Sequence, residues 1–151
     1  MWRIFRKKPF FSDEENEKIV HSIQEAEMQT SGEIRIFVEA HCKYVDALIR
    51  ASEIFDRLEM EKTNLRNGVL FYIAVKDRQL AIYADKGIHE AAGEKYWKTS
   101  VKDILSVFSK ESIVAGTITS IHKIGQALKD HFPYDKSVDK NELPDEIIFG
   151  N

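Results

Sequence analysis

The side chains best suited to chemistry are four oxygen-bearing residues that lie far apart in the sequence. Glu33, Asn67 and Asp85 each fall at the start or the end of an expected strand, and Glu90 follows a turn at Gly87. Hard cations such as calcium bind several oxygen ligands, and carboxylates from separate loops are a usual way to provide them. If the fold brings these residues to one edge, they predict a calcium or magnesium site. The simpler alternative is that the carboxylates only cap or solvate strand ends.

A second set of polar side chains lies where the first two expected strands end. It contains Asp46 and Asp77, with Glu39 and His41 close by. Ligands in open α/β sheets favour the carboxyl ends of parallel strands, so Asp46 and Asp77 make a second-choice metal site. A helix cap is the simpler role for Asp46, and Asp77 is a common turn residue.

Signatures of catalysis are absent from the sequence. It contains no Gly-x-Ser-x-Gly elbow and no glycine-rich phosphate loop. His89 and Glu90 match the start of a zinc-protease motif, but Gly93 occupies the position of the second histidine. Cys42 follows His41, and neighbouring residues in extended structure rarely point toward each other. We therefore assign no catalytic residue and leave open whether the protein is an enzyme.

Hydrophobic periodicity predicts the elements that would position these side chains. Helical spacing occurs at residues 12–28, 45–62, 97–108 and 114–132, with a short helical turn at 88–93. Strand patterns occur at 34–38, 69–75 and 80–84, and the second is apolar on both faces. A right-handed crossover should make the first two strands parallel, and a tight turn should return the third antiparallel.

This order predicts a single-domain α/β/α sandwich with a mixed central sheet, a βαββ core and helices on both faces. In such a sheet the first two strands start where the third strand ends. Glu33, Asn67 and Asp85 should therefore reach the same edge.

Length and composition limit the class of protein and its partners. The 151 residues fit one domain, which we divide into a basic aromatic segment at 1–11, an α/β domain at 12–133 and a polar tail at 134–151. A net charge of -3 argues against nucleic acid as a partner. The single cysteine suits a reducing compartment, and no stretch resembles a signal peptide or a transmembrane segment. We expect a cytoplasmic protein whose basic aromatic start could make peripheral membrane contact.

Three stretches resemble the TPM domain, the family of the plant thylakoid-lumen acid phosphatase of photosystem II repair. They read AEMQTSGEI at 26–34, RNGVL at 66–70 and ADKGI at 84–88, with Glu90 shortly after. The resemblance implies an α/β/α sandwich, divalent-cation binding as in some members, and accessory roles beside membrane complexes as in others. Many members carry a signal peptide or an anchor. Since this chain shows neither, it is most similar to a short, stand-alone bacterial form.

These observations leave three functional hypotheses. The leading one is a TPM-like module that binds calcium or magnesium at the four-residue edge cluster and engages an unknown protein partner, possibly a membrane-associated complex. The second is a phosphatase in which the cation polarises a phosphomonoester and activates water, with only Arg66 and Lys86 beside the cluster to clamp phosphate. The third is a pure interaction module without metal.

Overall fold

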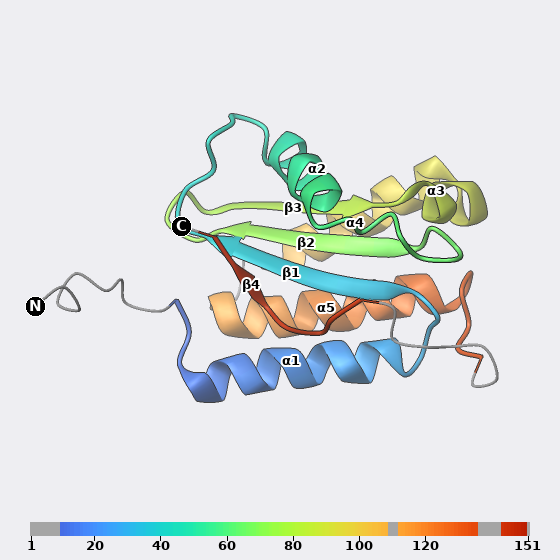
Figure 1. The fold of residues 1–151 in the computed structure, drawn as a ribbon, viewed down its shortest axis with the longest axis horizontal. Coiled ribbons are helices and arrows are strands. Elements are labelled where there is room, and N and C mark those ends of the chain that lie inside the picture. Colours follow the sequence, from blue (N-terminus) through green and yellow to red (C-terminus); the bar gives the residue numbers. More distant parts are fainter. Residues whose placement is uncertain (1–9, 109–111, 136–142, 151) are drawn as a thin grey trace, which may run out of the picture.

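The computed structural model describes residues 10–108, 112–135 and 143–150. Four strands form one sheet in the order β3-β2-β1-β4 (Figure 1): β1 (Glu33–Glu39), β2 (Gly68–Ala74), β3 (Gln79–Ala84) and β4 (Ile148–Phe149). β1 is parallel to β2 and to β4, whereas β2 and β3 form an antiparallel hairpin. The mixed sheet and the directions of its first three strands confirm the sequence prediction.

Five helices accompany the described strands, and polar caps fix where most of them begin. They are α1 (Asp13–Glu27), α2 (Ala47–Arg57), α3 (Lys86–Ala92), α4 (Glu94–Phe108) and α5 (Ile113–Lys129). Ser12 and Glu15 form a capping box: the Ser12 hydroxyl accepts from the Glu15 amide at 3.1 Å, and the Glu15 carboxylate accepts from the Ser12 amide at 2.8 Å. Asp46 caps α2 and Asp85 caps α3.

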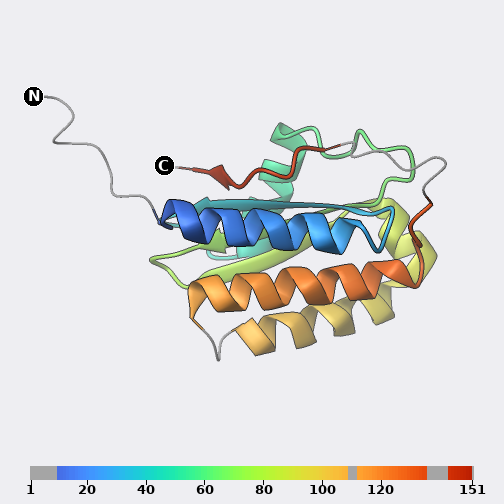
Figure 2. The same cartoon turned by 90° about the horizontal axis from the view of Figure 1, so that it is seen from below.

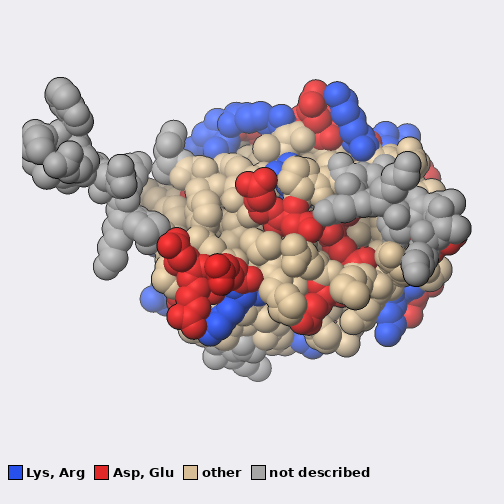
Figure 3. All heavy atoms as spheres, turned by 60° about the horizontal axis from the view of Figure 1, so that its bottom comes forward, with Lys and Arg blue, Asp and Glu red and all other residues tan. Residues whose placement is uncertain are grey.

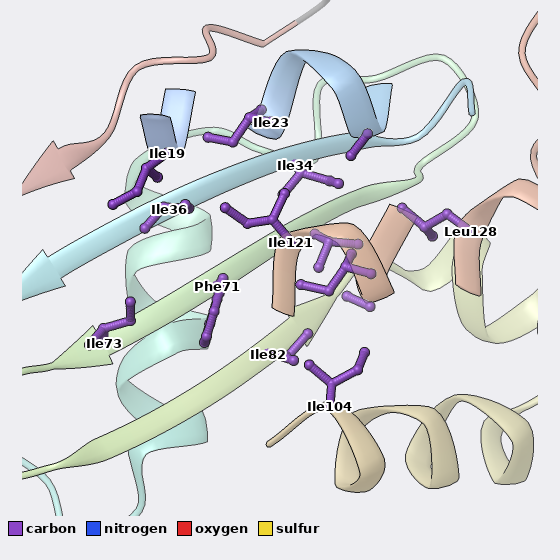
Figure 4. Close-up of a cluster of buried hydrophobic side chains, with 14 of the residues drawn as sticks. Ile19, Ile23, Ile34, Ile36, Phe71, Ile73, Ile82, Ile104, Ile121 and Leu128 are labelled. Carbon is purple, nitrogen blue, oxygen red and sulfur yellow. The ribbon is translucent and has the colours of Figure 1, made fainter. Parts of the chain in front are cut away.

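The sheet separates two hydrophobic cores. On one face, alternate residues of β1 and β2, such as Ile34, Ile36 and Phe71, pack against α1, α4 and α5 (Figure 4). Figure 2 shows α1, α5 and α4 side by side beneath the sheet. On the other face, Leu70 and Tyr72 pack against α2. Because both faces are covered, all of β2 is buried and the protein is the predicted α/β/α sandwich.

The C-terminal segment adds a strand that the sequence pattern does not reveal. Ile148 and Phe149 pair with Phe37 and Val38 of β1, and the Gly150 amide donates to the Val38 carbonyl at 2.7 Å. The Phe149 ring lies 6.2 Å from that of Phe10, between ring centroids. A two-residue strand is too short to show a period, so its position depends on these tertiary contacts.

Candidate functional site

Asp85, the central residue of the predicted metal site, forms an ion pair with Arg66. The guanidinium donates from Nε to Oδ2 at 2.7 Å and from Nη2 to Oδ1 at 2.9 Å. Asp85 Oδ1 also accepts from the Lys86 amide at 2.8 Å and so caps α3. Hydrogen bonding to Asp85 raises the pKa of Arg66 above its usual value. Both oxygens of Asp85 are therefore already bound by donors of this chain.

Two backbone features explain why Arg66 reaches Asp85. Arg66 has a φ of 51°, in the left-handed region, which turns the chain just before β2. Its carbonyl accepts from the Gly87 amide at 2.9 Å, and a Cβ atom on Gly87 would lie only 2.1 Å from the Leu65 carbonyl oxygen. Only glycine leaves room for this contact. The RNGVL and ADKGI motifs thus meet through a backbone contact and an ion pair.

The other predicted ligands reach the same edge but not a common point. Glu33 pairs with Gly68, and strand alternation places its side chain on the α2 face, while Asn67 faces α1 and α5. Asn67 Nδ2 donates to the Ser31 carbonyl at 3.3 Å. Glu90 lies on α3 and is exposed. The strand ends meet at one edge as predicted, but the alternation of side chains along each strand points Glu33 and Asn67 to opposite faces of the sheet.

Glu33 and Asp85 share the α2 face on either side of Gly68. Two strand spacings separate them, about 10 Å between their backbones. The Met60 carbonyl lies over Gly68, 3.1 Å from where a Cβ atom would be. Within the described ranges there is no group of three or more His, Cys, Asp or Glu side chains that could hold a metal ion. In this conformation the residues predicted from the sequence do not fit a metal, because the Arg66 guanidinium supplies the positive charge.

A second acidic group at this end of the sheet was not predicted from the sequence. Glu27, near the end of α1, hydrogen-bonds Asp145, which precedes β4, and its Oε2 accepts from the Ile34 amide at 2.8 Å. Burial, the bond to Asp145 and the nearby charge of Glu33 raise the pKa of Glu27 to about 11. Figure 3 shows acidic side chains in several places across the face that brings α1 forward. Glu27 lies within the AEMQTSGEI motif, but only the position of the C-terminal segment reveals its partner.

The opposite end of β1 holds a closed polar network. The Arg50 guanidinium donates to Glu39 from Nε at 2.9 Å and from Nη2 at 3.1 Å, and the Tyr72 hydroxyl also donates to Glu39. Glu39 and Arg50 are 5% and 8% exposed. Burial, followed by the bond to Glu39, raises the pKa of Tyr72 above its usual value. This network joins α2 to β1 and β2, and the chain itself satisfies it.

The second-choice ligands Asp46 and Asp77 have the local roles that the simpler alternative describes. Asp46 Oδ1 accepts from the Leu48 amide at 2.9 Å, as an N-cap does. Asp77, in the hairpin turn, lies 2.8 Å from His41 Nδ1 and accepts from the Cys42 amide at 2.7 Å. The hydrogen bond to His41 lowers the pKa of Asp77. Asp77 thus holds the loop after β1 against the hairpin.

A βαββ sheet between layers of helices, with the RNGVL and ADKGI motifs at one edge, defines a small α/β sandwich domain. The chain matches the family model of the TPM domain over residues 4–127. It belongs to the TPM domain family, and the resemblance drawn from the three motifs is confirmed. No curated protein matches the chain.

The solved structures that are similar to this protein include two determined by NMR. The NMR structure of the BA42 protein from the psychrophilic bacterium Bizionia argentinensis is 39% identical, with a TM-score of 0.84 over 96% of this chain and 99% of that chain. The solution NMR structure of the N-terminal domain of the cg2496 protein from Corynebacterium glutamicum is 11% identical, with a TM-score of 0.59 over 79% of this chain and 74% of that chain. The second likeness shows the fold alone.

A helix that crosses a bilayer needs about 20 consecutive, mostly apolar residues. Across the described part of the chain, no helix is both long and apolar enough to cross a membrane.

Proposed function

We propose that this protein is a divalent-cation-binding TPM module with an accessory role in protein interaction. The observation that carries the proposal is the pairing of Glu27 with Asp145 beside Glu33. Two carboxyl groups can hydrogen-bond each other only when one keeps its proton, and burial together with the bond to Asp145 raises the pKa of Glu27. The metal-free site therefore holds a proton where a cation would also be stabilised.

Calcium or magnesium would replace that proton. Glu27 and Asp145 would supply two carboxylates, and backbone carbonyls and water would complete the oxygen shell. This donor set suits a hard cation and does not need a third acidic side chain. Because Asp145 precedes β4, a bound cation would join the end of α1 to the segment that leads into the edge strand.

A cation titration with matched variants tests the proposal. Calcium, then magnesium, is added to the metal-free protein while backbone amide NMR signals are followed. Saturable shifts are expected at Asp145 and at Ile34, whose amide donates to Glu27. Protons should be released as the cation binds, because the ligands must lose them. Glu27→Gln should abolish the shifts, whereas Glu25→Gln, an exposed change on the same helix, should leave them intact.

Three outcomes would count against this assignment. Equal binding by the wild type and Glu27→Gln would remove Glu27 from the site. Shifts centred on Asp85 and Glu90, lost in Asp85→Ala, would move the site to the residues predicted from the sequence, with Arg66 displaced from Asp85. No saturable shift at millimolar ion would remove cation binding and leave the interaction role alone.

The geometry does not favour the phosphatase hypothesis. A phosphoryl clamp needs free positive charge beside the catalytic cation. Of the two cations beside the predicted cluster, Arg66 is paired with Asp85, and Glu61 and Glu90 add to the negative charge around it, which leaves only the exposed Lys86. We therefore base the proposal on cation binding and not on hydrolysis.

A further inference from the structure

β3 is an edge of the sheet, and no other described strand pairs with its outer side. The Asp85 amide donates to the Gly68 carbonyl at 3.0 Å, which fixes the hydrogen-bonding phase of the hairpin. Since the pattern alternates along an antiparallel pair, Ala81 and Tyr83 point their backbone groups at β2, while Leu80, Ile82 and Ala84 point theirs outward. Within the described ranges no group hydrogen-bonds the outward amides and carbonyls.

A cavity of about 700 Å³ runs along this edge. Figure 1 shows β3 between α2 and α4, which lie on opposite faces of the sheet. Trp97, Val101 and Leu105 of α4 line one wall of the cavity, and Leu48 in the first turn of α2 and Val45 just before that helix line the other. The edge is therefore the floor of an apolar groove and not a flat surface.

The edge lacks the features that usually protect exposed strands. Natural edges carry charged residues, proline or bulges that prevent pairing with another chain. β3 reads QLAIYA and contains none of these. Val45, which is 98% exposed, extends the apolar surface outward from the groove. Such a surface resembles a binding site more than a solvated edge.

The polar atoms in the groove indicate what kind of occupant fits. Gln79 Oε1 and His89 Nδ1, on side chains that line the cavity, are buried without a hydrogen-bond partner among the described residues. The charged lining residues already have partners within the chain, since Lys98 pairs with Glu94 at 3.3 Å and Asp46 caps α2. An uncharged occupant with both hydrogen-bond donors and acceptors complements this surface.

We propose that the β3 groove binds an extended peptide segment that adds a fifth strand to the sheet. Main-chain hydrogen bonds to Leu80, Ile82 and Ala84 would give affinity, and uncharged, largely apolar side chains would fill the two walls. The opposite edge shows the same principle within the chain, where the short strand β4 completes β1. A second copy of the chain fits less well, because its own α2 and α4 would meet the walls of the groove.

This inference rests on the interaction role proposed above and not on the cation site, with which the groove shares no residue. The β3 groove would be the surface for that interaction role, and an extended, uncharged peptide would be the class of partner. The test is therefore done in the presence of a chelator, so that failure of cation binding cannot affect it.

The probe is a capped peptide in which valine alternates with threonine over six positions, with one lysine at each end for solubility. These residues favour strands, and main-chain recognition tolerates sequence change. Amide hydrogen exchange is measured by NMR. In the free protein, Leu80, Ile82 and Ala84 should exchange faster than Ala81 and Tyr83. At peptide concentrations ten times the Kd, the first three should slow about tenfold.

Matched controls separate strand pairing from general apolar binding. A peptide with N-methylated valines keeps its side chains but loses backbone donors, and it should not protect the three amides. Leu80→Pro removes one outward donor without breaking the β2 ladder, so it should weaken binding at least tenfold. Leu48→Lys, in the groove wall, should also weaken binding, whereas Leu65→Lys, an exposed leucine elsewhere, should not. Glu27→Gln should bind the peptide as the wild type does.

Several results would overturn the inference. The peptide could leave exchange at Leu80, Ile82 and Ala84 unchanged, or the N-methylated peptide could protect them equally well. Equal peptide binding by Leu48→Lys and the wild type would also show that the groove is not the binding site. Protection of the three amides that grows with protein concentration, without peptide, would identify a second copy of the chain as the occupant instead.

Discussion

The two ends of β1 handle buried acids in opposite ways. At the carboxyl end, Glu39 is bound by Arg50 and Tyr72, so the chain supplies both the neutralising charge and the donors. At the amino end, Glu27 is bound by another acid, Asp145, and keeps a proton. At the carboxyl end the chain itself compensates the negative charge of Glu39, whereas at the amino end a cation could still stabilise the acidic pair.

The two ends of β1 differ in how readily each could bind a ligand. Carboxyl ends of parallel strands are the usual ligand edge of α/β sheets, but here Arg50 fills that position with an internal guanidinium. Breaking the Glu39–Arg50 pair to admit a ligand would leave the buried Glu39 carboxylate without a cation. A cation at the amino end would instead replace a proton, which is a smaller change. The Glu27 end is therefore better suited to bind a cation, and the Glu39 end to stabilise the fold.

The largest expected effect on stability comes from breaking the Arg50–Glu39 pair at the carboxyl end of β1. Arg50→Met leaves Glu39 buried beside Tyr72 without its cation, which should cost about 3–5 kcal/mol of unfolding free energy. Urea denaturation at pH 7 measures the loss. Arg57→Met is the control, since Arg57 is exposed and its bond to Glu53 is 3.4 Å long; it should change stability by less than about 0.5 kcal/mol. Equal effects of the two variants would mean that Glu39 is not a closed, buried site.

Glu27→Gln should stabilise the metal-free protein at pH 8 by about 2 kcal/mol. The glutamine can still accept from the Ile34 amide and donate to Asp145, but it needs no proton. The pKa of Glu27 is raised in the folded state, so the wild type has its full stability below the unfolded value near 4.5 and loses it as pH rises toward about 11.

Urea denaturation from pH 4 to pH 9 measures this effect. The unfolding free energies of the wild type and Glu27→Gln should change with pH in the same way only near pH 4. Glu25→Gln should follow the wild type at every pH. A constant difference between Glu27→Gln and the wild type at all pH values would show that the proton on Glu27 is not responsible.

Tyr72→Phe should have a smaller effect at the closed end. Glu39 loses the tyrosine donor but keeps both bonds from Arg50, so the expected cost is about 1–2 kcal/mol. A double-mutant cycle with Arg50→Met measures the coupling between the two donors. Additive losses would contradict a single network, because residues that share one carboxylate should be coupled.

The fold could be predicted from the sequence where periodic patterns were long. The capping box of Ser12 and Glu15, the β2 run and the tight hairpin each indicate an element locally, and the crossover rule then orders the sheet. β4 could not be predicted, because Ile148 and Phe149 pair with β1 only through tertiary contacts.

The candidate site shows where local reasoning stops. The sequence placed Glu33, Asn67 and Asp85 correctly at one edge, but it could not show that pleating turns Asn67 away. The pairing of Arg66 with Asp85 depends on a positive φ and on the space beside Gly87, neither of which has a periodic signal. Glu27 was overlooked because its partner, Asp145, is distant in sequence and comes near only when β4 docks.

The smallest expected effect concerns the predicted ligand Asp85. Asp85→Asn removes the charge paired with Arg66 but keeps an oxygen to cap α3, so the loss should be below about 1 kcal/mol. Arg66 is 37% exposed, and water can solvate it once the pair is broken. Asp85→Ala, which also removes the cap, should cost about 1 kcal/mol more in the same urea experiment. If Asp85→Asn instead cost as much as Arg50→Met, the pair would behave as a buried network. The amino end would then contain its own closed site, and a cation could reach it only by displacing a guanidinium held as tightly as Arg50.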